Sequence, residues 1–96
     1  MLILVTYDVE TIAAEGRKRL RQVAKECMNY GQRVQNSVFE CNVDNTQYNR
    51  LKIKLADIIN HKTDSIRLYN MGNSFSSKVE TIGRNDSINL TETLII

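Results

Sequence analysis

The chain opens with a continuous run of apolar residues, Leu2–Tyr7, which contains β-branched members and ends at Asp8. A run of this length is too short for an independent helix and is typical of a central strand that is covered on both faces. After a turn over Val9–Ala14, apolar residues recur at helical spacing and predict a buried stripe made of Leu20, Val23, Ala24, Cys27 and Met28. Gly31 is a suitable C-terminal cap, so the first helix is predicted from Ala14 to Tyr30.

The middle of the chain combines one ambiguous segment with one clear helix signal. Gln32–Val43 is rich in β-branched and apolar residues, and its pattern fits either one bent strand or a short hairpin broken near residues 36–37. Asp44 and Gln47 have the spacing of a capping box, which marks the start of a helix. The helix that follows is predicted to end near Asn60, and its apolar stripe consists of Tyr48, Leu51, Leu55, Ile58 and Ile59.

The last third of the chain predicts two strands and an apolar tail. Ser65–Met71 alternates between apolar and polar positions, and a shorter strand is expected at Lys78–Ile82 after a turn at Gly72–Ser74. This order of elements is typical of an α+β ferredoxin-like βαββαβ sandwich with an additional C-terminal strand. The chain ends in the apolar segment Thr93–Ile96. This segment either adds a strand to its own sheet or pairs, together with the preceding strand, with a second protomer, and we favour the second alternative for residues 78–96.

Length and composition place the whole chain in one small domain. Of its 96 residues, 42% are hydrophobic and 25% are charged, so one ordinary globular domain is expected over residues 1–96. No apolar run approaches the roughly 20 residues of a membrane helix, and no signal peptide is recognisable, so the chain is expected in the cytoplasm. Cys27 and Cys41 lack the spacing of a zinc site and are expected to be free thiols. The single histidine, His61, is expected to be a solvated residue near a helix end.

Positive charge is concentrated in one part of the chain. The net charge is only +2, but six basic residues and one acidic residue between Arg17 and Arg33 give that stretch a charge of +5. The six are Arg17, Lys18, Arg19, Arg21, Lys25 and Arg33. A local basic face favours a polyanionic partner, although a solvated helix face explains the same run. The predicted helix start adds its dipole to the charges of Arg17, Lys18, Arg19 and Arg21, which favours phosphate binding there.

Two further features are candidates for chemistry. Asp8 ends the first strand where the chain turns toward the basic helix, and a single carboxylate can hold an Mg²⁺ ion that keeps its waters. The alternative is an aspartate that only stabilises its own turn. In a continuous strand Arg33, Gln35, Ser37 and Phe39 share one face, where the arginine can bind a phosphate and the ring can stack on a base. A half-exposed sheet face explains this alternation equally well.

Several segments together resemble one known family. They are Leu2–Val9 (LILVTYDV), Arg17–Arg21 (RKRLR), Tyr30–Glu40 (YGQRVQNSVFE), Leu68–Asn73 (LYNMGN) and Val79–Gly83 (VETIG). In this combination, and at this length, the chain resembles the second core CRISPR-associated protein, a small ferredoxin-like endonuclease that is the partner of the CRISPR integrase. The resemblance covers nearly the whole chain, and residues 85–93 are the part least like the family.

The resemblance implies a homodimer and a metal-dependent endonuclease that hydrolyses phosphodiester bonds in RNA or double-stranded DNA. Asp8 from each protomer is expected to share Mg²⁺, or another divalent cation such as Mn²⁺, near the twofold axis. The catalytic residues implied by the resemblance are Asp8, Tyr7, Arg33, Ser37 and Phe39. A role beside the CRISPR integrase in spacer acquisition and antiviral defence is implied as well.

Two other functions stay open on the sequence. A non-catalytic dimeric scaffold that binds DNA and bridges integrase subunits needs only the basic residues. A small regulatory or RNA-binding domain of the same fold would use aromatic residues on adjacent strands, for which Tyr7 and Phe39 are the candidates. Neither function needs a metal, so cleavage assays with Mg²⁺ and with a chelator distinguish both from the nuclease.

Overall fold

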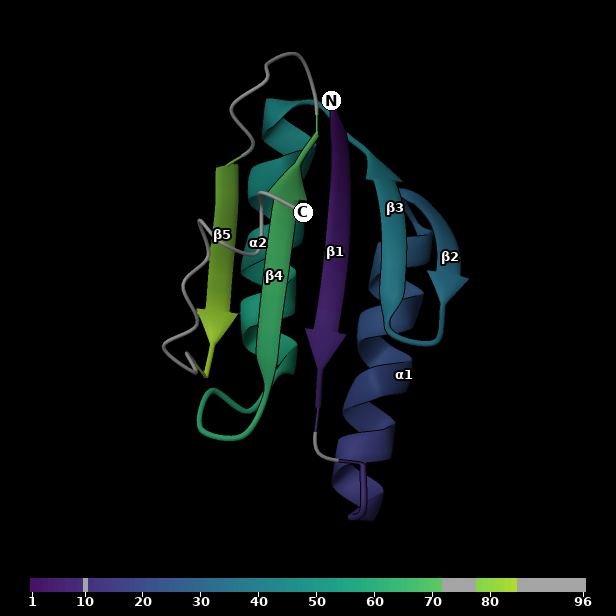
Figure 1. Ribbon diagram of the computed structural model, residues 1–96, viewed down its shortest axis with the longest axis vertical. Coiled ribbons are helices and arrows are strands. Elements are labelled where there is room, and N and C mark those ends of the chain that lie inside the picture. Colours follow the sequence, from purple (N-terminus) through teal and green to yellow (C-terminus); the bar gives the residue numbers. More distant parts are fainter. Residues whose placement is uncertain (10, 72–77, 85–96) are drawn as a thin grey trace, which may run out of the picture.

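Two helices cover one face of a five-stranded antiparallel sheet in the computed structural model, which describes residues 1–9, 11–71 and 78–84 (Figure 1). The elements are β1 (Leu2–Asp8), α1 (Ala14–Met28), β2 (Gly31–Gln35), β3 (Val38–Asn42), α2 (Asn45–Ile58), β4 (Ser65–Asn70) and β5 (Lys78–Gly83). The strand order is β2-β3-β1-β4-β5, so the first six elements form a ferredoxin-like βαββαβ unit and β5 extends it at the β4 edge. The predicted fold class is confirmed.

The apolar run at the start of the chain forms the central strand β1. Ile3, Val5 and Tyr7 point toward the helices and are buried, because alternate residues of a strand face the same side of a sheet. The intervening Leu4 and Thr6 lie on the opposite face and are half-buried. The expected cover on both faces is therefore wrong for the described residues, where the helices cover only one face.

The first helix ends earlier than its pattern predicts. Helix α1 stops at Met28 and is capped by Asn29, whereas Gly31 begins β2. A side chain at Gly31 would run into the carbonyl oxygen of Glu40 on the neighbouring strand. The glycine is thus needed for the close pairing of β2 with β3, and the prediction of a helix cap at this position is wrong.

The ambiguous segment after α1 is a hairpin. Strands β2 and β3 pair antiparallel, with Arg33 opposite Phe39 and Gln35 opposite Val38, and the register shifts between residues 33 and 35. The turn falls at residues 36–37, where the sequence placed the possible break. The hairpin alternative is confirmed, and the single bent strand is wrong.

The second helix begins where the capping box predicts. The backbone N–H of Gln47 donates to Asp44 Oδ1 at 2.7 Å, and the backbone N–H of Asp44 donates to Gln47 Oε1 at 3.0 Å. Both bonds satisfy donors that a helix start leaves without partners. Beyond the helix, His61 Nε2 lies 2.7 Å from the carbonyl oxygen of Ala56, and its ring is exposed, consistent with its expected place near a helix end.

Both cysteines lie in the core between sheet and helices. Cys27 of α1 and Cys41 of β3 are free and fully buried, and Cys41 Sγ lies 3.5 Å from the carbonyl oxygen of Cys27. The hydrogen bond to Cys41 and burial raise the pKa of the Cys27 thiol. The predicted free thiols are confirmed, and they are more deeply buried than a surface thiol that reacts readily.

Strand β5 pairs with β4 of its own chain. The register runs from Asn70 opposite Lys78 to Ser65 opposite Gly83. Glu80 anchors the strand to α2, because Tyr48 Oη donates to Glu80 Oε1 at 2.9 Å and Lys52 Nζ lies 3.1 Å from Glu80 Oε2. Residues 78–83 thus pair with β4 within the chain, and the expected pairing of residues 78–96 with a second protomer stays a prediction. The apolar tail and the turn at residues 72–74 lie outside the described residues.

Candidate nucleic-acid and metal site

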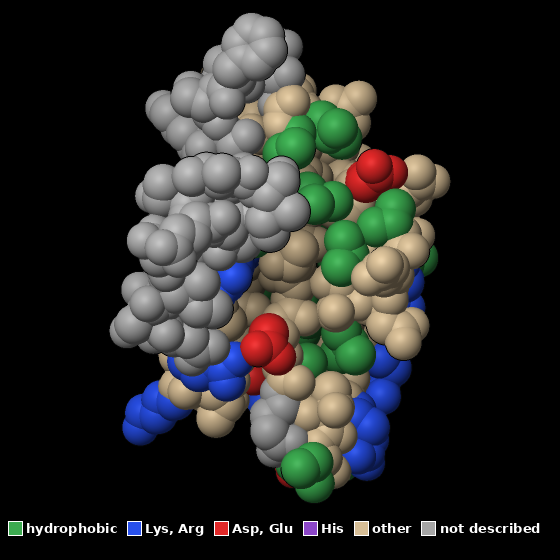
Figure 2. All heavy atoms as spheres, in the orientation of Figure 1, with side chains coloured by type: hydrophobic (Ala, Val, Ile, Leu, Met, Phe, Trp, Pro, Cys, Tyr) green, Lys and Arg blue, Asp and Glu red, His purple; other side chains and the backbone are tan. Residues whose placement is uncertain are grey.

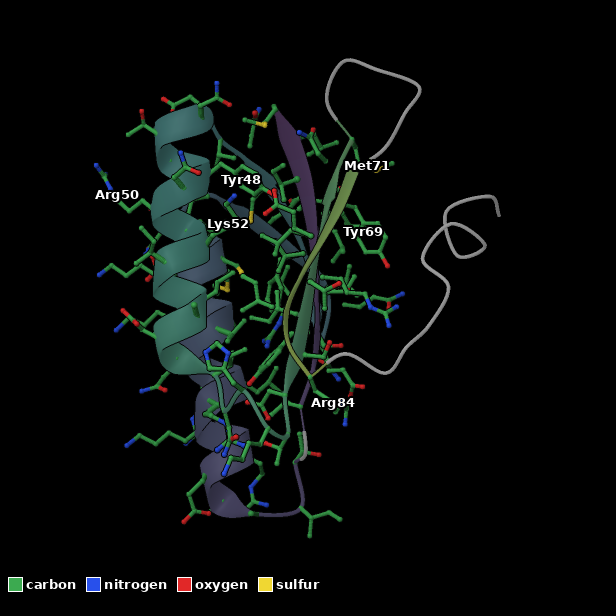
Figure 3. All side chains as sticks on the ribbon, turned by 90° about the vertical axis from the view of Figure 1, so that its left-hand side faces the viewer. Tyr48, Arg50, Lys52, Tyr69, Met71 and Arg84 are labelled. Atoms are coloured by element: carbon green, nitrogen blue, oxygen red, sulfur yellow. The ribbon has the colours of Figure 1, made fainter. Side chains whose placement is uncertain are left out.

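The candidate metal ligand Asp8 lies at the end of β1, on the sheet face opposite the helices. It stands beside Ser65 of β4, and its side chain is 73% exposed. The guanidinium of Arg84, directly after β5, donates to it, with Arg84 Nη2 2.6 Å from Asp8 Oδ2. Figure 3 shows Arg84 at the end of β5, on the side of the sheet away from α2. The candidate site is thus an exposed carboxylate that is paired with the guanidinium of Arg84.

Two backbone features bring Arg84 to Asp8. Gly83 has a positive φ of 94°, and a Cβ there would collide with the carbonyl oxygen of Asp64. The backbone N–H of Arg84 donates to that same carbonyl oxygen at 2.6 Å. The sharp turn at Gly83 needs a residue without a side chain, and it directs Arg84 back across the ends of β4 and β1. Sequence reasoning missed Arg84 because the sequence alone does not give the strand register that brings it to Asp8.

A fully buried carboxylate, Asp64, lies directly behind this turn. It accepts hydrogen bonds from Tyr7 Oη at 2.8 Å, Arg19 Nε at 2.7 Å, the backbone N–H of Asn60 at 3.0 Å and Thr63 Oγ1 at 3.0 Å. Arg19 Nη2 adds a second contact at 3.2 Å, which makes the ion pair two-pronged. Burial disfavours the charged form of Asp64, but these donors outweigh it and lower its pKa.

This network changes the interpretation of two predicted site residues. Tyr7 is almost completely buried, and burial together with the bond to Asp64 raises the pKa of its hydroxyl. Arg19 is directed inward at Asp64, and its side chain is only 19% exposed. The structure thus gives Tyr7 a core position and Arg19 a buried ion pair, in place of the predicted contacts with substrate and phosphate. Asp64 itself was missed because it lies in a short loop and its side-chain partners Tyr7 and Arg19 are distant in sequence.

The basic residues at the start of α1 have different surroundings. Arg17 Nη1 donates to the carbonyl oxygens of Thr11 and Ile12, at 3.1 and 2.9 Å, and so braces the turn before the helix. Lys18 and Arg21 are exposed and belong to none of the ion pairs among the described residues. These two cations therefore present the predicted basic face most directly to solvent.

The predicted base-stacking face does not form. Phe39 is fully buried, and the guanidinium of Arg33 lies over its ring at 5.4 Å from the centroid. Phe39 has no surface on which a base can stack, so that interpretation is wrong. Ser37 lies at the hairpin turn, where its carbonyl oxygen accepts from the backbone N–H of Tyr7 at 2.9 Å. The structure brings Ser37 to the end of β1 near Asp8, whereas Arg33 lies two strands away.

The donor set at Asp8 is sparse for a metal. Within the described ranges, no group of three or more His, Cys, Asp or Glu side chains is placed to hold an ion. Mg²⁺ keeps several waters and is commonly held by one or two carboxylates plus substrate phosphates. An exposed Asp8 fits that role as one ligand. Arg84 competes for the same carboxylate oxygen.

The sheet face opposite the helices carries exposed apolar side chains. Figure 2 views this face and shows apolar side chains gathered over part of the sheet, with basic side chains along its lower edge. Leu2 and Met71 are among the exposed large apolar residues, and Figure 3 shows Tyr69 on the same side.

No helix among the described residues is long and apolar enough to cross a membrane.

Comparison with known proteins places the sequence in one family. Residues 1–79 match the family described as CRISPR associated protein Cas2. The chain belongs to this family. It is 57% identical over 95 residues to a protein from Halalkalibacterium halodurans named CRISPR-associated endonuclease Cas2, with 99% of each chain covered. It is 51% identical over 96 residues to the CRISPR-associated endoribonuclease Cas2 of Chlorobaculum tepidum, and both chains are covered completely.

Two solved structures support the fold. The crystal structure of Streptococcus pyogenes Cas2 at pH 6.5 superposes with a TM-score of 0.73 at 60% identity, covering 75% of this chain and 87% of that one. A hypothetical protein from Thermus thermophilus superposes with a TM-score of 0.65 at 27% identity, covering 88% and 94%. The predicted family resemblance is confirmed.

Proposed function

We propose that this Cas2 chain is an endonuclease that hydrolyses phosphodiester bonds in RNA or double-stranded DNA with the help of a divalent cation. The observation that carries the proposal is the exposed carboxylate of Asp8 at the end of the central strand, with Arg84 beside it. The names endonuclease and endoribonuclease that its curated relatives carry support the same reaction class.

The cation in this proposal is Mg²⁺ or Mn²⁺, held by Asp8 from each of two copies. Such an ion, when bound, polarises a phosphoryl oxygen and lowers the pKa of water. Arg84 has two roles in the proposal: it neutralises Asp8 when no ion is bound, and it binds a phosphate oxygen when substrate is present. Lys18 and Arg21 hold flanking phosphates through charge alone.

The dimer in this proposal forms through the sheet face opposite the helices. Half-buried Leu4 and exposed Leu2 and Met71 lie on this side, and an apolar face of this kind is stabilised when a second copy packs on it. The end of β1, with Asp8, opens on the same side of the sheet. Pairing through this face in the cytoplasm, beside the CRISPR integrase, completes the proposal for spacer acquisition.

A second function is favoured by the ion pair at Asp8. One carboxylate per chain, already bonded to Arg84, is a weak metal site, whereas Lys18 and Arg21 are available to phosphates. A non-catalytic dimeric scaffold that binds DNA between integrase subunits uses only these cations. It predicts binding of duplex DNA without cleavage.

The decisive experiment compares Asp8→Asn with Asp57→Asn, which removes an exposed carboxylate of α2 that belongs to none of the ion pairs among the described residues. We expect Asp8→Asn to abolish Mg²⁺-dependent cleavage of RNA and duplex DNA, and Asp57→Asn to cleave like the wild type. Duplex binding should persist in both variants. Cleavage by purified Asp8→Asn protein at the wild-type rate rules out the nuclease at Asp8, and binding without any cleavage by the wild type supports the scaffold.

A further inference from the structure

A basic hollow lies between the second half of α1 and the edge strand β2, away from Asp8. Its volume is about 440 Å³. The lining residues are Arg21, Ala24, Lys25, Met28, Asn29 and Arg33. Three of the six carry positive charge and none carries negative charge, so the hollow has the electrostatic character of an anion site.

The fold brings the three cations together from two elements. Arg21 and Lys25 are four residues apart on α1 and therefore project from the same helix face, about 6 Å apart along the axis. Arg33 comes from β2, and its guanidinium rests over the ring of Phe39 at 5.4 Å from the centroid. Because Phe39 belongs to the rigid core, this contact restrains the Arg33 side chain at the rim.

The positive charges of the hollow are not neutralised by acids within the described part of the chain. The ion pairs there join Arg19 to Asp64, Lys52 to Glu80 and Arg84 to Asp8, and none involves Arg21, Lys25 or Arg33. Glu26 lines an adjacent hollow against α2, which shares Lys25 and Asn29 with this one, and it forms no ion pair with Lys25. Like charges held close together repel, so an anion that enters the hollow relieves this repulsion.

We propose that this hollow binds a phosphate of a nucleic-acid backbone. The guanidinium of Arg33 and the amide of Asn29 donate hydrogen bonds to phosphate oxygens, and Arg21 and Lys25 contribute charge. This inference rests on the proposed nucleic-acid function and adds to it a second anchor point. Lys25 lies about 12 Å along the helix from Arg17, so one strand that follows α1 from its first turn reaches the hollow.

The test compares two double variants that remove the same charge. Lys25→Gln with Arg33→Gln changes the hollow, and Arg50→Gln with Lys62→Gln removes two exposed cations outside its lining. Binding of a fluorescent duplex is followed by anisotropy across a salt series. We expect the hollow variant to bind about tenfold more weakly or worse at roughly 0.1 M salt, and its slope of log K against log salt to flatten by about 2. The control should keep the wild-type slope.

The outcomes separate this inference from the function on which it rests. If both double variants lose affinity equally, the hollow is only part of a diffuse positive field and the inference is wrong, while nucleic-acid binding stands. If the wild type does not bind the duplex at all, the proposed function and the inference both fail. Thermal unfolding with inorganic phosphate tests whether the ligand of the hollow is free phosphate. If phosphate stabilises the wild type but not the hollow variant, and the two proteins bind the duplex equally well, the hollow is a site for free phosphate and the proposal is overturned.

Discussion

Arg84 and Asp8, separated by 76 positions in the sequence, form an ion pair with 2.6 Å between Nη2 and Oδ2 at the ends of β5 and β1. A residue proposed to hold a metal therefore already has a cation bonded to it. A divalent ion must displace this guanidinium or share the carboxylate with it. The strength of metal binding then depends on Arg84 as well as on Asp8.

Removing the competing cation should strengthen metal binding. Because an exposed ion pair contributes about 0.2–1 kcal/mol, we expect Arg84→Gln to bind Mn²⁺ up to about fivefold more tightly. Isothermal titration calorimetry measures this directly, with Arg50→Gln as the control for loss of one exposed positive charge. Equal Mn²⁺ affinity in wild type and Arg84→Gln would show that Arg84 does not compete at Asp8.

Tyr7 should behave as a structural residue. Tyr7→Phe removes one hydrogen bond to the buried charge of Asp64, which should lower the free energy of unfolding by about 1–2 kcal/mol in urea. Cleavage by the folded fraction should stay at the wild-type level, because the hydroxyl points into the core and not toward Asp8. A large loss of cleavage without loss of stability would return Tyr7 to the catalytic set.

Asp64 should make stability sensitive to acid. Its folded-state pKa lies below the ordinary value of 3.8, so between these two values the unfolded chain binds the proton that the folded chain rejects. The contribution of Asp64 to the free energy of unfolding is therefore fully present above about pH 5 and is lost as the pH falls through the pKa of the folded state. Asp64→Asn should be less stable at neutral pH by about 2–4 kcal/mol and should show a shallower acid limb in urea unfolding. An acid limb identical to that of the wild type would contradict this role.

Gly83 should tolerate no side chain. Gly83→Ala combines a strained positive φ with a collision at the carbonyl of Asp64, and should lower the free energy of unfolding by at least about 1 kcal/mol. The same change should displace Arg84 from Asp8, so the affinity for Mn²⁺ should rise, as expected for Arg84→Gln. Gly16→Ala, in the first turn of α1, is a comparison at a helical glycine. Unchanged stability of Gly83→Ala would mean that the turn relaxes without effect.

Most of the fold could be predicted from patterns among residues that are close in sequence. The capping box of Asp44 and Gln47 needs only neighbours in sequence, so α2 was predicted to begin where it does. The end of α1 was misplaced because Gly31 serves a contact with Glu40 on another strand, which the sequence does not display. The hairpin stayed ambiguous for the same reason, since β-branched residues fit both a bent strand and two paired ones.

The candidate site was predicted only where it depends on a strand end. Asp8 follows an apolar run, so its exposure at the end of the central strand could be inferred from its position in the sequence. Arg84 and Asp64 could not, because their roles arise from contacts between segments 45 to 76 residues apart. Arg19 lies in a basic run, which indicated an exposed side chain. In the structure its ion pair with Asp64 holds the side chain toward the core.

The hydrogen bonds to Asp64 have a consequence for how this family diverges. Its carboxylate accepts hydrogen bonds from β1 and α1 together, so an apolar residue at position 64 leaves Tyr7 and Arg19 without their acceptor. Substitutions at these three positions are therefore strongly coupled. Among Cas2 sequences we expect their identities to be inherited and replaced as a set, whereas Asp8, exposed at its strand end, is free to follow selection on chemistry alone.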